Sequence, residues 1–182
     1  FMNLTITGCS VKGSTITGKG SAGGVIAHGT NDPWTNLSIE STTVSGNSVI
    51  STGSSTNKAG AIMGTIGAAG QPTTANGVTL TGGATVSATV AGNTVTSGGT
   101  TITTIYGRQG TPTGMLELNG GSYDNYPIEK NVTYAAPAEG YEIEKNEDGT
   151  YGVVFSAVAQ IGTKYYADLR EAMGTCKFQW YI

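Results

Sequence analysis

The chain has 182 residues and a net charge of −3, and its 12% of charged residues is about half the usual share. With 37% hydrophobic residues and 29 glycines among many Ser, Thr and Asn, the composition excludes intrinsic disorder and favours short strands joined by turns. The nine basic residues are scattered along the chain, so nucleic acid is not an expected partner. No apolar run is long enough for a membrane-spanning helix.

Similar segments follow one another from the N-terminus. Those starting at Asn3 and Asn36 each contain an alternating strand, a strand bounded by glycine and a small-residue strand ending in glycine. We place a third copy at Asn76 and a fourth at Gly114, so the spacing drifts between 33 and 40 residues and insertions are expected at the corners. Short strands in such a series are typical of coils that stack on one another.

The sequence therefore predicts an all-β fold, a right-handed parallel β-helix with three short strands per coil. In this arrangement Leu4, Leu37 and Val78 are expected to form one inward-facing column, and outward Thr-x-Thr triplets are expected to lie in rows. The drifting spacing disfavours the regular array that an ice-binding surface needs. A β-sandwich with turns every 8 to 12 residues or so is the alternative fold.

Residues 22–29 (AGGVIAHG) and 59–67 (AGAIMGTIG) resemble the glycine motif of GLUG repeats, which occur in large bacterial surface proteins and beside some immunoglobulin-A-cleaving metallopeptidases. Residues 7–18 (TGCSVKGSTITG) are similar to the strand that flanks this motif in β-helical surface proteins. The first copy keeps the glycine pair as Gly23 and Gly24, whereas the second has Ala61 after Gly60. The resemblance covers about residues 3–108 and implies a bacterial, secreted or cell-surface protein.

Charge density changes after residue 107, because only five of the 21 charged residues precede that point. Since the repeated pattern also fades there, we predict a β-helix repeat domain over 1–135. Residues 136–182 are then a β-hairpin linker and the start of a following unit. Phe1 suggests a processed N-terminal boundary.

The region after residue 140 predicts a different local structure. Residues 141–155 alternate around an Asn-Glu-Asp-Gly turn and predict a β-hairpin. Residues 158–173 predict two strands and a short helix capped by Asp168. This stretch resembles the opening segment that precedes many bacterial β-helix domains.

A search for catalytic or metal-binding groups gives one weak candidate site. His28, Asp32 and Trp34 are close enough in sequence to share a corner, where Trp34 would stack on a sugar ring. A solvated loop around the Asn-Asp-Pro turn is the alternative. Further exposed aromatics expected to contact sugars are Tyr106, Tyr123 and Tyr126.

No cofactor or metal is predicted. Cys9 and Cys176 lack zinc-site spacing, and we expect two free thiols, with a disulfide between them as the alternative. The acids of the hairpin region are expected to face solvent rather than bind calcium. They are Glu139, Glu142, Glu144, Glu147 and Asp148.

These patterns favour a non-catalytic repeat segment of a bacterial cell-surface or secreted protein, acting as a structural spacer or adhesive surface. Its expected partners are host or environmental glycans or proteins, and the oligomeric state is left open. A carbohydrate-binding module and a fragment of a polysaccharide-degrading β-helix enzyme are the alternatives. Fold alone does not decide among them.

Overall fold

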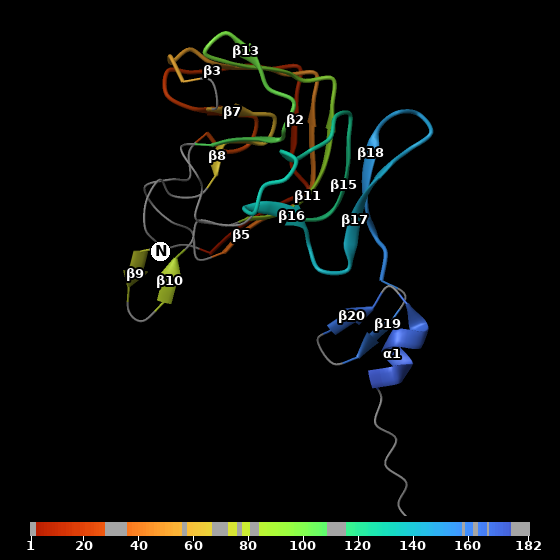
Figure 1. The fold of residues 1–182 in the computed structure, drawn as a ribbon. Coiled ribbons are helices and arrows are strands. Elements are labelled where there is room, and N and C mark those ends of the chain that lie inside the picture. The colour runs from red at the N-terminus through yellow and green to blue at the C-terminus, as the bar shows by residue number, and fades with distance from the viewer. Residues whose placement is uncertain are drawn as a thin grey trace, which may run out of the picture.

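The computed structural model describes residues 3–27, 36–55, 58–66, 73–75, 78–80, 84–108, 116–157, 159–161, 164–166 and 168–175 (Figure 1). Within these ranges the chain forms the strands β1 to β20 and one seven-residue helix, α1. This helix is too short to cross a membrane. The predicted all-β class is confirmed, and much of the strand pairing is parallel.

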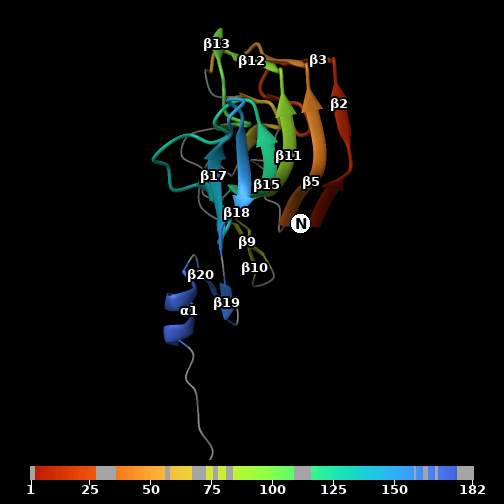
Figure 2. The ribbon, with the colours of Figure 1, turned by 90° about the vertical axis from the view of Figure 1, so that its right-hand side faces the viewer.

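The largest sheet has the strand order β1, β5, β11, β15, β18 and β17, and Figure 2 shows these strands side by side. Pairing is parallel from β1 to β15, and β18 then pairs antiparallel with both β15 and β17. Strand β2 pairs with β5, and β16 pairs with β15. The bounds are β1 (Asn3–Thr7), β2 (Ser10–Lys12), β5 (Asn36–Ser45), β11 (Ala84–Ala91), β15 (Leu116–Tyr123), β16 (Ala135–Pro137), β17 (Tyr141–Lys145) and β18 (Tyr151–Phe155).

Smaller sheets and hairpins complete the described part of the chain. The parallel pairs are β3 (Thr15–Gly18) with β6 (Ser48–Ser51), β6 with β12 (Thr94–Ser97), β4 (Ala22–Gly23) with β7 (Ala59–Gly60), and β8 (Met63–Ile66) with β14 (Tyr106–Arg108). The antiparallel pairs are β12 with β13 (Thr100–Thr101), β9 (Thr73–Ala75) with β10 (Val78–Leu80), and β19 (Ala159–Ile161) with β20 (Lys164–Tyr166).

One column of residues runs across the largest sheet. Leu4 pairs with Leu37, Leu37 with Ala84, and Ala84 with Leu116, at intervals of 33, 47 and 32 residues. The expected place of Val78 in this column is wrong, because Val78 lies in β10 and pairs antiparallel with Ala75. The extra residues before Ala84 thus include a separate hairpin.

Alternate side chains of a strand point to the same face, and the buried ones of this sheet are mostly apolar and form the core. Ile39, Val86 and Leu118 have no exposed surface, and Val49 and Val95 continue the apolar layer on β6 and β12. Buried apolar area of this kind provides the main stabilisation of a fold whose individual strands are short.

Asparagine side chains connect three turns of the chain, at residues 13–14, 46–47 and 92–93. The Asn47 side chain, 2% exposed, accepts a hydrogen bond from the Ser14 amide (2.9 Å) and donates one to the Val11 carbonyl (2.9 Å). Its backbone amide donates to Asn93 Oδ1 (3.0 Å), and Asn93 Nδ2 donates to the Val44 carbonyl (2.8 Å). The two side chains therefore satisfy buried backbone groups that the turns leave unpaired.

Asn47→Ala is expected to lower the free energy of unfolding by about 2–3 kcal/mol, because it removes a buried side chain and leaves the half-buried backbone groups of Val11 and Ser14 without their partner. Urea denaturation measures this loss. Asn125→Ala removes an exposed side chain and serves as the control, with an expected change under about 0.5 kcal/mol. Equal stabilities of the two variants would contradict the role of the Asn47 side chain.

Close backbone approach explains a glycine in the small-residue strands. A Cβ on Gly60 would overlap the carbonyl oxygen of Met63 and the Cα of Tyr106. Neither contact can be relieved by a side-chain rotation, since both involve main-chain atoms. Gly60 therefore sets how closely the β7 and β14 segments approach.

Gly60→Ala is expected to destabilise the protein by about 2 kcal/mol or more, because the backbone must move apart in a packed interior. Gly20→Ala is the matched control, since a Cβ there has no atom within 4 Å. Thermal denaturation followed by circular dichroism compares the two. The explanation fails if both variants melt at the wild-type temperature.

The predicted elements after residue 140 are confirmed. Strands β17 and β18 form a hairpin in which Gly149 has a φ of 88°, and its amide donates to the Asn146 carbonyl (3.0 Å). Asp168 Oδ1 accepts a hydrogen bond from the Arg170 amide (2.6 Å) at the start of α1 (Leu169–Thr175). The hairpin also extends the largest sheet, because β18 pairs with β15.

Candidate functional site

The sugar-binding residues expected from the sequence, His28, Asp32 and Trp34, lie outside the described residues, as does Cys176. Cys9 is a free, exposed cysteine. No group of three or more His, Cys, Asp or Glu side chains that could hold a metal ion is found in the described ranges. The site must therefore be sought among other residues.

Two aromatic residues expected at the surface are buried. Tyr106 and Tyr123 are 2% and 1% exposed, so their rings are not available to stack on a sugar. Tyr126 is half-buried and packs edge-to-face on Tyr151, with ring centroids 5.5 Å apart. The expectation that Tyr106 and Tyr123 form an exposed sugar-binding surface is wrong.

The acidic residues of the hairpin region face solvent, as expected. Glu139, Glu142, Glu144, Glu147 and Asp148 are all exposed. The Asp148 carboxylate accepts hydrogen bonds from the Thr150 hydroxyl (2.6 Å) and amide (2.9 Å), which lower its pKa. These contacts order the turn.

A polar cluster forms where two distant segments meet. The Ile105 amide donates to the Pro127 carbonyl (3.0 Å), which brings the start of β14 beside the loop that contains Glu129. The Glu129 amide then donates to the hydroxyl oxygen of Tyr106 (3.1 Å). Backbone hydrogen bonding thus positions Glu129.

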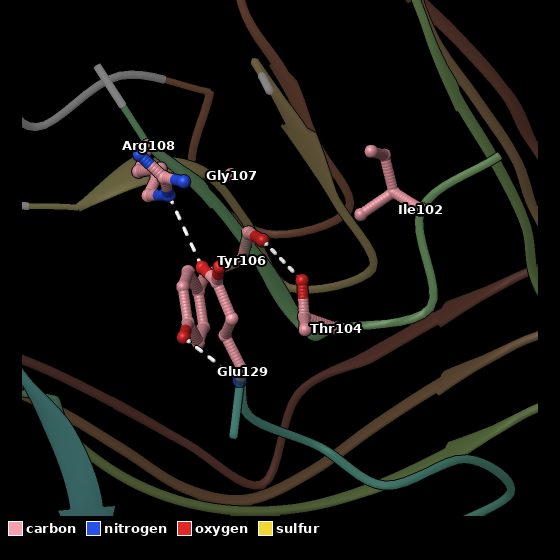
Figure 3. A pocket seen from close by; sticks show the side chains of 6 residues that line it. All are labelled: Ile102, Thr104, Tyr106, Gly107, Arg108 and Glu129. Carbon is pink, nitrogen blue, oxygen red and sulfur yellow. Dashed lines mark hydrogen bonds and ion pairs between the residues drawn. The ribbon is translucent and has the colours of Figure 1, made fainter. Parts of the chain in front are cut away.

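The Glu129 carboxylate is held by two side chains through one of its oxygens. Arg108 Nε lies 3.1 Å from Glu129 Oε2, and the Tyr134 hydroxyl donates to the same oxygen at 2.7 Å. Figure 3 shows the Arg108 and Glu129 side chains meeting beside the Tyr106 ring. Tyr106 and Tyr134 pack edge-to-face with centroids 6.3 Å apart, so the cluster has a rigid aromatic base.

Hydrogen bonding and charge shift the proton affinities of the cluster. The hydrogen bond from Tyr134, followed by the Arg108 charge, lowers the pKa of Glu129. Burial is the main cause that raises the pKa of Tyr106 and Tyr134, and the hydrogen bond to Glu129 adds to the rise at Tyr134. The cluster therefore contains an ionised carboxylate and two protonated tyrosines at neutral pH.

A small hollow of about 40 Å³ adjoins the cluster. Ile102, Thr104, Tyr106, Gly107, Arg108 and Glu129 line it. The volume holds roughly three water-sized groups. It is too small to enclose a substrate, but it can receive one polar group of a larger ligand.

No local pattern in the sequence predicts this cluster. Arg108 and Glu129 are separated by 21 residues and belong to no recognised motif. Their pairing depends on the backbone contact between Ile105 and Pro127, which only the fold provides.

The outward side of the largest sheet is a second candidate surface, which we call the outer face. Parallel register aligns small hydroxyl side chains in rows across β1, β2, β5, β11 and β15. One row contains Thr5, Ser38, Thr85 and Glu117, and another contains Ser10, Thr43, Thr89 and Ser122. All eight residues are exposed or half-buried, so the rows form a hydroxyl-rich surface.

Comparison with known proteins finds no matching family model, no matching curated protein and no matching solved structure.

Glu129→Gln is expected to reduce the pH dependence of stability. Because the pKa of Glu129 is lower in the folded chain, the ionised carboxylate contributes stability above its unfolded pKa of about 4.5. This contribution is lost as the pH falls through the folded pKa. Urea unfolding at neutral and acidic pH should therefore show a larger acid-induced loss for the wild type than for the variant.

Glu147→Gln is the control for this experiment, because Glu147 is exposed in the hairpin turn. We expect it to keep the wild-type dependence on pH. If Glu129→Gln also keeps that dependence, the carboxylate does not stabilise the fold through its ionised form.

Proposed function

We propose that the chain is a right-handed parallel β-helix segment of a bacterial secreted or cell-surface protein, where it serves as a non-catalytic spacer with an adhesive outer face. The observation that carries the proposal is the parallel register of β2, β5, β11 and β15, which aligns one hydroxyl side chain from each strand in a single row. The resemblance of residues 22–29 and 59–67 to GLUG repeats supports the same class of protein.

The chemistry of the outer face suits broad, weak adhesion. Hydroxyl groups both donate and accept hydrogen bonds, and short side chains such as Thr43 and Thr89 lose little rotamer entropy on contact. Glu117 is the one charged residue in the two rows, so the outer face favours neutral partners. Such partners include host or environmental glycans and proteins. Many such contacts on repeated modules would add through multivalency.

Carbohydrate binding at a defined site is the second candidate, and the hollow beside Arg108 and Glu129 favours it. A polysaccharide-degrading enzyme is the third. Such an enzyme would need a pair of acids placed on either side of the bond it cleaves. Glu129, the acid beside the hollow, is already hydrogen-bonded to Arg108 and Tyr134.

Thr43→Arg is expected to weaken adhesion roughly tenfold, because a long charged side chain would stand in the middle of a hydroxyl row. Beads coated with the chain are passed over cellulose, chitin, mucin and collagen, and their retention is counted. Thr17→Arg places the same side chain at an exposed position on β3 and is the matched control.

Retention that falls in Thr43→Arg but not in Thr17→Arg supports the adhesive outer face. Absence of retention on every material, or equal losses in both variants, rejects it. Release of soluble sugars from cellulose, chitin or mucin would instead indicate an enzyme.

A further inference from the structure

We infer that the hollow beside the Arg108–Glu129 ion pair is a subsite for the hydroxyl groups of a neutral sugar. This inference deepens the carbohydrate-binding alternative and does not depend on adhesion through the outer face. It rests on the hydrogen-bonding capacity, charge balance, shape and rigidity of the residues that line the hollow.

The carboxylate of Glu129 has one occupied and one available oxygen. Oε2 accepts the hydrogen bonds from Arg108 and Tyr134, whereas Oε1 has no partner in the part of the chain that the structure describes. The side chain is 43% exposed, so solvent and ligands can reach it. A carboxylate oxygen in this state is a strong acceptor for a hydroxyl donor.

Thr104 adds a second polar group on the same side of the hollow. Its hydroxyl donates to the Tyr106 carbonyl (2.7 Å), which orients the oxygen and leaves its lone pairs as acceptors. Figure 3 shows Thr104 between Glu129 and Ile102. Ile102 contributes an apolar surface, so the lining combines hydrogen-bonding and apolar groups as the C–H and O–H faces of a sugar do.

The charge balance favours a neutral ligand. Arg108 and Glu129 form an ion pair at 3.1 Å, so their opposite charges largely cancel outside the cluster. An anionic ligand would meet the Glu129 carboxylate, and a cationic ligand would meet the Arg108 guanidinium. A polyol experiences neither repulsion.

The hollow is preformed. Tyr134 and the Tyr106 hydroxyl hold the Glu129 side chain and backbone, and both rings are buried. These contacts restrict Glu129 before a ligand arrives, which reduces the entropy lost on binding. Since about 40 Å³ receives only part of a sugar ring, we expect a dissociation constant in the millimolar range for a single sugar.

The test is an NMR titration of the ¹⁵N-labelled full chain with methyl α-D-glucopyranoside, methyl α-D-mannopyranoside and methyl β-D-galactopyranoside, each to about 50 mM. At least one glycoside should shift the amide signals of Gly107, Arg108 and Glu129. Tetrahydropyran, which has the ring but no hydroxyl groups, should leave them in place.

Two variants test the acceptors. Glu129→Gln keeps one oxygen for Arg108 and Tyr134 but replaces the other with an amide donor, and Thr104→Val removes the hydroxyl at nearly constant volume. Each should weaken binding at least fivefold while retaining a folded spectrum. Glu147→Gln, in the hairpin turn, should bind as the wild type does.

The inference is overturned if no glycoside shifts these signals, if tetrahydropyran shifts them equally, or if both folded variants bind normally. These outcomes are independent of bead retention, which reports on the outer face. Binding of a glycoside without bead retention would support the subsite and reject the adhesive face, and the reverse pattern would do the opposite.

Discussion

Parallel pairing of β5 with β1 on one side and β11 on the other is the interaction on which the rest of the structure depends. Each strand is too short to bury an apolar face alone, but the shared register joins Leu37 to Leu4 and Ala84 and makes a continuous core. The same register brings Asn47 within hydrogen-bonding distance of Asn93 at the corner. Core packing and satisfaction of buried polar groups are therefore consequences of one alignment.

Local patterns were sufficient to predict the hairpin and the helix, since the Asp-Gly turn and the Asp168 cap act within a few residues. Alignment of the third segment failed because Val78-Thr-Leu and Ala84-Thr-Val alternate in the same way. Alternation identifies a strand but does not choose its partner. The Gly-Asn pair that recurs at 46–47 and 92–93 indicates the correct alignment of the second and third segments. These residues occupy equivalent turns in the structure.

The burial of Tyr123 shows a second limit of alternation. Strict alternation from the buried Leu116 and Leu118 would place the Tyr123 side chain on the outer face. However, β15 has one extra residue relative to β11 between Leu118 and Gly120, which shifts the register. The extra residue moves every later side chain to the opposite face, so Tyr123 points inward. The polar cluster of Arg108 and Glu129 could not be predicted for a related reason. It forms only because two segments distant in the chain are in contact.

The scarcity of charge also follows from parallel stacking. Equivalent side chains on neighbouring strands lie about 4.8 Å apart, and like charges at such a distance repel by about 1 kcal/mol even in water. Glu40 lies between Thr7 and Ser87, so its charge has no like neighbour in that row. Glu142 and Glu144 lie instead on β17 at the end of the sheet, where charge hinders further strand pairing. Uncharged hydroxyl and amide side chains can repeat from strand to strand without this repulsion, so parallel stacking favours the low share of charged residues in this chain.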